Sequence, residues 1–511
     1  MPEQNRLTAK VNINDMPKWF KAIYILAPIA GLLMIATRVD NDFYFIFKTG
    51  EYIINNGLPH TDFLSMHSDM HMIAQQWLSA VIFYSIYEVL GRFGVIAFVY
   101  ICYTLLCIVM FKLTNLITNN LFIGCAFAFV ADILAASMFE KTRPQAITML
   151  LILTALYLLE SYVQKKKLIY LALLPVISLL LINLHAAMWI MLFVFAAPYG
   201  AAAIPFKFKN IKQEPCCSFI KLIICGVVCV GVGFINPYGF EAMKYIVTSF
   251  GQGEINQLIQ EMQKTSLADA WGIVFFSVLA ILLCIGIFVK QKAFTTRFVL
   301  LFLGTTLMAL FNSKSIAYFI IGGIPAFSYL VKDAQIKLRV DKGKRTKKEK
   351  KKLVLLVSLM VVMLGVLAVV VTSHVTNTAP IENKTNQYYE SLDDIVEILD
   401  KENKDDVVLF AGFNVGQYFE YYGYHPYIDG RAELFLKENN KKFDYLNEYN
   451  EIVNAQIYYK DFINKYHFNY FVIDKHESYL ETSLKKDKDY ELVYKSDYLK
   501  LFRLKDTADA K

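Results

Sequence analysis

Ionisable side chains that could do chemistry are concentrated in one polar stretch near the start of the chain, residues 38–77. The stretch contains four aspartates and three of the eight histidines of the sequence, and strongly apolar runs flank it on both sides. Charged groups at the edge of a membrane-spanning region mark chemistry or recognition. The candidates for acid–base chemistry or ligand binding are Asp40, Asp42, His60, Asp62, His67, Asp69 and His71.

The composition of the chain requires a membrane around this stretch. Of its 511 residues, 56% are hydrophobic and only 19% are charged, proportions that no ordinary soluble protein of this length needs. The formal charge of +7 does not indicate nucleic-acid binding, because the basic residues cluster in short loops between apolar runs, where they set orientation in a bilayer. The sequence predicts an α-helical polytopic membrane protein with no nucleic-acid partner.

Apolar runs long enough to approach a bilayer crossing recur from residue 18 to residue 373. They predict about 12–13 transmembrane helices within a membrane domain of residues 18–379. The twelve visible runs are residues 18–37, 74–90, 93–112, 117–138, 143–161, 167–183, 185–205, 217–235, 269–289, 296–311, 314–331 and 353–373.

The basic loops predict how these runs are oriented. Loops rich in Lys and Arg favour the cytoplasmic side, so we expect the N-terminal segment 1–17 there, together with the loops at 165–167, 207–212, 290–297 and 332–352. Twelve crossings that strictly alternate in direction would not place all of these loops on the cytoplasmic side. Either one crossing is hidden or one visible run is re-entrant; we favour two short crossings within residues 112–142, which gives thirteen. The outer loops are then residues 38–73 and 236–268.

One aspartate interrupts an apolar run. Asp132 lies within AFAFVADILAASMF, where a charged side chain is costly unless it is paired or faces water. Two interpretations stay open: Asp132 faces the substrate cavity, or it marks the break between two short crossings.

Residues 380–511 differ in character from the rest of the chain. They are rich in Lys, Asp, Glu, Asn and Tyr, and their apolar runs shrink to strand length at Val407–Phe410 and Tyr470–Ile473. Helical patterns occur near Ser391 and Tyr459, and the end of the chain alternates like a β-hairpin. We expect a small soluble α/β domain on the outer face of the membrane.

Short polar motifs recur at the ends of the apolar runs. In chain order they are Asp42, Phe43, Tyr44, Phe45, Gly50, Gly57, Pro59, Asp62, Ser65, Gln76-Trp77-Leu78, Arg143-Pro144-Gln145, Asn183-Leu184-His185, Asn236-Pro237-Tyr238-Gly239, Glu261 and Asp429-Gly430-Arg431. Over nearly the whole chain this order resembles bacterial membrane proteins of the GT-C glycosyltransferase superfamily. Two positions depart from the pattern: Ile46 stands where such sequences often carry His, and Lys314 where they often carry Arg.

The resemblance implies transfer of a sugar from a polyprenyl-phosphate carrier to an acceptor at the outer membrane interface, of the kind that mannosyl- and arabinosyltransferases perform. Such a reaction needs a base at headgroup level, and Asp42, with Asp40 beside it as the second candidate, is placed to take the proton of an acceptor hydroxyl. The structural alternatives for Asp42 are the cap of an outer helix and a solvated loop charge.

The leaving phosphate needs cationic partners because negative charge develops on it. Arg143 is favoured, since a guanidinium can bind phosphate through two hydrogen bonds; the alternative is that it only reaches to the interface from a span. Lys314 offers a second positive charge. The other predicted substrate-binding residues are His60, Asp62, His185 and Glu261. For Asp62, a structural role as the N-cap of an interfacial helix fits equally well.

No cofactor is expected. A divalent cation at the loop histidines is an open alternative, although their spacing fits no rigid metal site. The expected partners are a lipid-linked sugar donor, an acceptor that is a glycan, lipid or protein, and membrane lipids. Two other functions remain: a non-catalytic assembly or glycan-binding protein and, less favoured, a transporter or flippase, which usually has two related halves.

Overall fold

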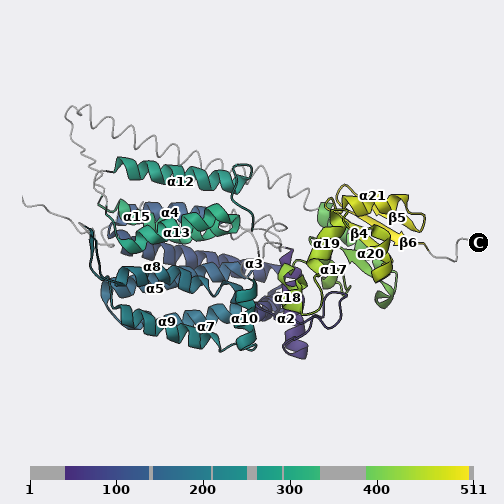
Figure 1. Cartoon of the computed structure of the whole chain (residues 1–511), viewed down its shortest axis with the longest axis horizontal. Helices are drawn as coiled ribbons and strands as arrows, with labels where there is room; N and C mark the ends of the chain where they lie inside the picture. The colour runs from purple at the N-terminus through teal and green to yellow at the C-terminus, as the bar shows by residue number, and fades with distance from the viewer. Residues whose placement is uncertain are drawn as a thin grey trace, which may run out of the picture.

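The computed structural model describes residues 41–136, 142–208, 211–249, 262–289, 293–333 and 387–505. The expected spans 18–37 and 353–373, most of the basic loop 332–352, and two predicted site residues, Asp40 and Glu261, lie outside the described residues. A bundle of long helices forms one part of the molecule, and a domain with a small sheet lies at one end of the bundle (Figure 1).

The bundle helices run roughly side by side (Figure 1). Four segments of the described chain are long and apolar enough to cross a membrane, at Trp77–Thr118, Gln145–Lys165, Ala186–Ala203 and Ala270–Ile287. This confirms the polytopic helical class. The helices are α3 (Trp77–Thr118), α4 (Leu121–Ala136), α5 (Gln145–Lys165), α6 (Ile169–Ala172), α7 (Leu174–Leu184), η3 (Ala186–Met188), α8 (Met191–Ala203), α9 (Phe219–Gly233), α12 (Ala270–Phe288), α13 (Thr296–Phe311), η5 (Ser313–Ser315), α14 (Ile316–Tyr318), the π-helical η6 (Phe319–Gly323) and α15 (Ile324–Leu330).

Helix α3 has two arms, because Gly91 adopts φ 61° and ψ −162°, a conformation outside the helical region. The first arm is held at one end of the bundle. Its Trp77 Nε1 donates to Asn183 Oδ1 (3.1 Å) and its Ser79 hydroxyl donates to the Leu184 carbonyl (2.7 Å), where α7 ends. The second arm, residues 92–118, packs along α4 and α5. The expected crossing at 74–90 is therefore wrong, since this arm stays at the bundle end.

The hidden crossing expected in residues 112–142 is wrong as well. Residues 112–118 are the last turns of α3, and α4 runs without a break from Leu121 to Ala136. Asp132 consequently marks no break between short crossings. It is buried, and the Tyr103 hydroxyl donates to its backbone carbonyl (2.9 Å).

The described residues of the basic loops at 165–167, 207–212 and 290–297 lie at the bundle end opposite the first arm of α3. The Lys166 ammonium donates to the Cys216 carbonyl, and the Ala293 N–H donates to the Leu330 carbonyl (3.2 Å). A short hairpin of β1 (Phe206–Phe208) and β2 (Ile211–Gln213) lies there too. Because the first arm of α3 is no crossing, alternation of the described helices places these loops together and needs no hidden span.

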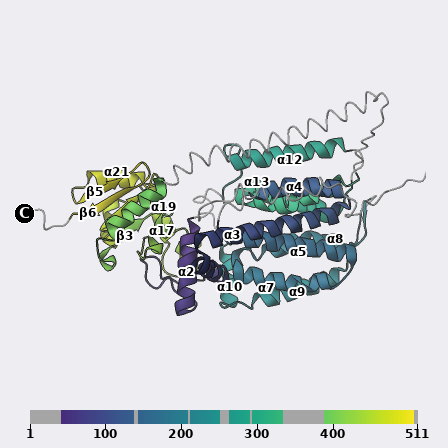
Figure 2. The ribbon, with the colours of Figure 1, turned by 180° about the vertical axis from the view of Figure 1, so that it is seen from behind.

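Helix α2 (Asp42–Asn56) lies across the end of the bundle, roughly at right angles to its helices (Figure 2). Its buried face, which includes Phe43, Ile46 and Phe47, packs on the first arm of α3. Gly50 permits this approach, because a Cβ there would lie 2.2 Å from the Ala80 carbonyl oxygen. The close contact holds Asp42, the first residue of α2, at a fixed place.

We expect Gly50→Ala to lower the unfolding free energy by about 1–3 kcal/mol, because the added methyl group must push α2 off the Ala80 backbone. Thermal unfolding in detergent would measure this. Gly304→Ala in α13 is the matched control, since a Cβ there meets nothing within 4 Å. Equal unfolding temperatures for the two variants would contradict the tight contact.

The C-terminal domain has a four-stranded mixed sheet, in the order β3-β4-β6-β5. β3 and β4 are parallel, whereas β6 pairs antiparallel with β4 and β5. Helices cover the sheet, and the α/β class, the two strands and the final hairpin are confirmed. The elements are residues 387–399 (helical), η7 (Lys404–Asp406), β3 (Leu409–Ala411), α17 (Gly416–Tyr421), η8 (Ala432–Phe435), α18 (Lys437–Asn440), α19 (Tyr445–Val453), α20 (Tyr459–Tyr466), β4 (Tyr470–Ile473), α21 (Ser478–Lys486), β5 (Tyr490–Lys495) and β6 (Lys500–Leu504).

The two predicted outer loops share the hydrophobic core of this domain. Met70 and Met72 from the first loop and Tyr238 from the segment before α10 (Phe240–Ser249) are buried in one cluster with Phe410 and Phe435 of the domain. The Tyr238 hydroxyl also donates to the Pro59 carbonyl (2.9 Å). Loops and domain therefore form one packed unit on the bundle end.

Candidate active site

A cavity of about 750 Å³ lies where the bundle end, α2 and the C-terminal domain meet. Four residues that the sequence predicted as site residues line it together: Asp42, Arg143, His185 and Lys314. They come from α2, the segment before α5, the junction of α7 with η3, and η5. Asp132 does not line this cavity, so the structure contradicts its predicted place there.

Asp42 and Arg143 form an ion pair in this cavity, with 3.1 Å between Asp42 Oδ2 and Arg143 Nη1. Both side chains are partly exposed, at 27% and 17%, so a ligand can reach them. Asp42 occupies the first turn of α2, after the N-cap residue Asn41. Arg143 directly precedes Pro144, the N-cap of α5. A carboxylate that can accept a proton thus lies beside a guanidinium that can bind an anion.

His185 presents a lone pair to this cavity. The Thr148 hydroxyl donates to the Pro144 carbonyl (3.1 Å), so its oxygen accepts the hydrogen bond from His185 Nδ1 (2.9 Å). The other ring nitrogen, Nε2, then keeps its lone pair. Burial, and then the nearby Lys314 ammonium, lower the pKa of His185 to about 3. The imidazole is therefore neutral, and its Nε2 can accept a hydrogen bond.

The loop Asp429-Gly430-Arg431 of the C-terminal domain closes the cavity over Asp42. A Cβ on Gly430 would lie 3.4 Å from Asp42 Oδ1, and the Gly430 N–H donates to Gln417 Oε1 (3.2 Å). Asn41, next to Asp42, donates to the Asn414 carbonyl and accepts from the Tyr389 hydroxyl, both at 3.0 Å. These contacts with the C-terminal domain therefore fix the position of Asp42.

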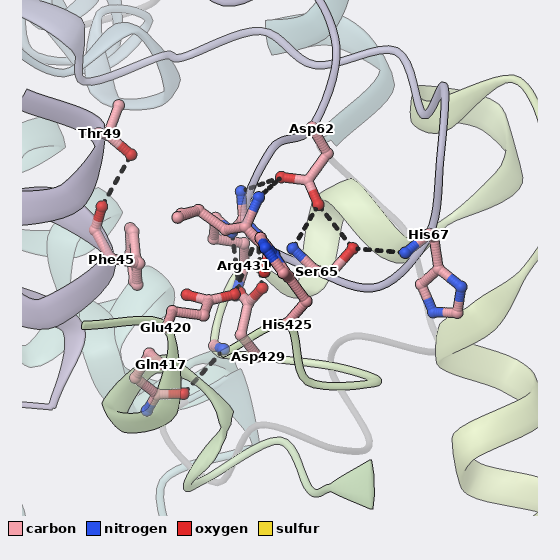
Figure 3. Close-up of polar contacts among 12 residues, drawn as sticks. Phe45, Thr49, Asp62, Ser65, His67, Gln417, Glu420, His425, Asp429 and Arg431 are labelled. Carbon is pink, nitrogen blue, oxygen red and sulfur yellow. Dashed lines mark hydrogen bonds and ion pairs between the residues drawn. The ribbon is translucent and has the colours of Figure 1, made fainter. Parts of the chain in front are cut away.

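Arg431 is buried among three carboxylates, as Figure 3 shows. Its Nη1 lies 2.6 Å from Asp62 Oδ1, its Nη2 lies 2.6 Å from Asp429 Oδ2, and Nη2 also lies 3.4 Å from Glu420 Oε1. Asp62 further accepts from the Ser65 hydroxyl (2.6 Å) and backbone N–H (3.0 Å). This cluster ties the first outer loop to the loop that covers Asp42.

Charges within the cluster shift the carboxyl groups in opposite directions. Burial alone would raise the pKa of Asp62, but the Arg431 guanidinium and the Ser65 hydrogen bonds lower it. Burial, followed by the Asp429 carboxylate, raises the pKa of Glu420 well above its usual range. The guanidinium thus favours the ionised form of Asp62, whereas burial beside Asp429 favours the protonated form of Glu420.

Asp62 and His60, both predicted to bind substrate, do not line the cavity. The Asp62 carboxylate binds Arg431, and His60 is exposed against the Tyr238 ring (5.5 Å between centroids). The other loop histidines have separate partners: His67 bonds to the Tyr427 carbonyl (2.8 Å), and His71 lies 3.8 Å from Glu241. Within the described ranges, no three His, Cys, Asp or Glu side chains converge on a metal position.

Burial of His67 predicts that acid weakens the docking of the first outer loop. Burial lowers the pKa of His67 from 6.5 to about 4, although the Tyr427 carbonyl opposes the shift. Unfolded chains take up the proton below pH 6.5, whereas the folded chain does so only near pH 4. Stability should therefore fall between these values, by up to about 1.4 kcal/mol per pH unit.

Thermal unfolding between pH 7 and pH 5 tests this. His67→Gln, which keeps a donor for the Tyr427 carbonyl, should flatten the pH dependence. His60→Gln changes an exposed histidine of the same loop and should leave the dependence as in the wild type. A wild-type slope in the His67 variant would show that other groups cause it.

Sequence reasoning missed the neutral side chains of the cavity. Eight of its 33 lining residues carry amides, and of these only Gln76 and Gln145 belong to a motif noted in the sequence. Amide side chains are common in any polar loop, so these residues can be recognised as part of a site only when the structure shows that they line one cavity. The amide residues are Asn41, Gln75, Gln76, Gln145, Asn414, Gln417, Asn450 and Asn454.

No protein-family model and no curated protein sequence matches the chain. Solved structures do match its fold. The oligosaccharyltransferase of Archaeoglobus fulgidus, solved with a tethered acceptor peptide, superposes with a TM-score of 0.56 at 12% identity, over 89% of this chain and 69% of that one. ArnT from Cupriavidus metallidurans, bound to undecaprenyl phosphate, gives 0.52 at 10% identity, over 96% and 98%.

The chain has the GT-C glycosyltransferase fold. Arabinofuranosyltransferase AftD from Mycobacteria gives a TM-score of 0.51 at 10% identity, over 95% of this chain but 40% of that longer one. The predicted resemblance is thus confirmed at the level of the GT-C fold. In this chain, the GT-C fold brings four of the predicted site residues into one cavity.

Proposed function

We propose that this chain transfers a sugar from a polyprenyl-phosphate carrier to an acceptor, with Asp42 as the base. The observation that carries the proposal is the meeting of Asp42, Arg143, His185 and Lys314 in one cavity at the bundle end. ArnT, which shares the fold, binds undecaprenyl phosphate. The acceptor class and the identity of the sugar, hexose or pentose, are left to experiment.

In the proposed reaction, the carrier phosphate displaces Asp42 from Arg143 and binds between Arg143 and Lys314. The acceptor hydroxyl then attacks the anomeric carbon, its proton passes to the Asp42 carboxylate, and the bond from carbon to phosphate oxygen breaks with its electron pair on the phosphate. The two cations stabilise the negative charge that develops there. A divalent cation is not part of this proposal.

The arrangement of the bundle supports an outward-facing cavity. The described residues of the basic loops at 165–167, 207–212 and 290–297 lie at the bundle end opposite the cavity, and clustered Lys and Arg favour the cytoplasmic side. The proposal therefore places the N-terminus in the cytoplasm and the C-terminal domain outside. The pairing of a carboxylate with anion-binding cations supports an enzyme over an assembly protein or a flippase.

The test is release of polyprenyl phosphate from a panel of polyprenyl-phosphate sugars by the purified protein in lipid, with glycan, lipid and peptide acceptors supplied in turn. The doubly substituted protein Asp42→Asn/Arg143→Met is the matched blank. Release by the wild type alone would support the proposal and identify the sugar. Equal release by both, or by neither with any acceptor, would overturn it.

A further inference from the structure

Two glutamines on the bundle side of the cavity have side chains that the fold leaves unsatisfied. The side-chain oxygens Gln75 Oε1 and Gln76 Oε1 are buried, and neither accepts a hydrogen bond from the described residues. Both residues line the cavity. A buried acceptor without a donor is destabilising, and such groups in a native fold call for a partner.

The backbone of these glutamines is fixed. The Gln75 carbonyl accepts from the Ala186 N–H (2.9 Å), and the Gln76 carbonyl accepts from the Ala80 N–H (2.9 Å) as the first arm of α3 begins. The Gln75 N–H donates to the Ile73 carbonyl (2.9 Å). The backbone of both residues is therefore fixed before any ligand binds, and only their side chains remain to be ordered by a ligand.

The groups at this wall of the cavity can both accept and donate: the two glutamine oxygens and His185 Nε2 are acceptors, and the glutamine NH2 groups are donors. The residue that bonds to Gln75, Ala186, follows His185, whose Nε2 also keeps a lone pair. A ligand that satisfies three acceptors must bring several hydrogen-bond donors. A phosphate brings only acceptors, and Arg143 and Lys314 already match it. Hydroxyl groups on a saccharide are the donors that fit.

We propose that Gln75 and Gln76 form the subsite for the sugar of the lipid-linked donor, whose hydroxyls donate to the two side-chain oxygens. This inference rests on the proposed function and names its sugar-binding residues. Their place next to His185, on the bundle side with Arg143, assigns the donor sugar to them. An acceptor would approach from the opposite wall, where the C-terminal domain supplies Asn414, Asn450 and Asn454.

The experiment compares wild type, Gln75→Met and Gln76→Met with the donor that the wild type uses. Each methionine keeps the length of the side chain and removes the acceptor, so kcat/KM for the donor should fall about five- to tenfold. The KM for the acceptor and the binding of polyprenyl phosphate without a sugar should stay unchanged. Gln456→Met, an exposed glutamine outside the cavity, is the control.

Donor analogues that lack one hydroxyl provide a second test, which compares donors on the same protein and so tolerates a variant that folds poorly. A deoxy sugar that loses turnover with the wild type should lose no further turnover with the matching methionine variant. Unchanged donor kinetics in both variants, additive losses with every deoxy donor, or a change in acceptor KM alone would overturn the sugar subsite. A wild type that neither turns over a donor nor binds polyprenyl phosphate would instead overturn the proposed function and the subsite with it.

Discussion

Asp42→Asn should lower the release of polyprenyl phosphate by about 100- to 10,000-fold, the range that removal of a positioned general base usually costs. The asparagine keeps the shape of the side chain and can still contact Arg143, so the cavity should survive. Its amide cannot accept the proton of an attacking hydroxyl. Turnover with saturating donor and acceptor, measured beside binding of polyprenyl phosphate, separates the lost chemistry from lost binding.

Asp69→Asn is the matched control for this loss of charge. Asp69 is exposed in the same outer loop and has φ 59°, a conformation that asparagine adopts readily. It should keep wild-type turnover. If Asp42→Asn retained more than a tenth of the wild-type rate, Asp42 would not be the base. Glu433, the other carboxylate among the described residues that line the cavity outside the Arg431 cluster, would then be the residue to test.

Arg431→Met should lower the free energy of unfolding by about 3–5 kcal/mol, because it leaves the buried Asp62 and Asp429 carboxylates without their cation. Activity should fall with it, since the Asp429-Gly430-Arg431 loop lies against Asp42. Thermal unfolding in detergent and donor turnover are the two measurements. The double variant Asp62→Asn/Arg431→Met should recover part of the stability, because one unpaired charge has been removed.

Arg503→Met provides the comparison for an exposed pair. Arg503 lies 2.7 Å from Glu491, but both side chains are well exposed, at 43% and 38%. Its removal should change the unfolding free energy by less than about 1 kcal/mol. Similar losses for Arg431 and Arg503 would show that the buried cluster does not hold the loop and the domain together.

Charges at the ends of apolar runs were the informative signal in the sequence. Arg143, His185 and Lys314 could be predicted as site residues because polar motifs at the ends of apolar runs follow the order that GT-C sequences show, and the structure brings all three into one cavity. The contact of Asp62 with Arg431 could not be predicted, because it joins residues 369 positions apart and either residue alone resembles a solvated loop charge.

The errors in topology have a physical cause. An apolar helix that lies along the bundle end and one that crosses the bilayer have similar compositions, so the run 74–90 resembled a span. The turn at Gly91, with its positive φ, distinguishes the two cases, but a glycine in an apolar run is equally compatible with a continuous helix. When this run is counted as a crossing, the basic loops no longer all fall on the same side of the membrane. The hidden span was predicted only to remove that disagreement.

The shared core of the outer loops and the C-terminal domain also constrains how the protein is made. Met70 and Met72 emerge early in synthesis, whereas Phe410 and Phe435, against which they pack, emerge more than 300 residues later. The first loop must therefore wait, with its apolar side chains exposed, until the rest of the chain is complete. The cavity is then assembled last, so a truncated chain would carry Asp42 and Arg143 but no closed site between them.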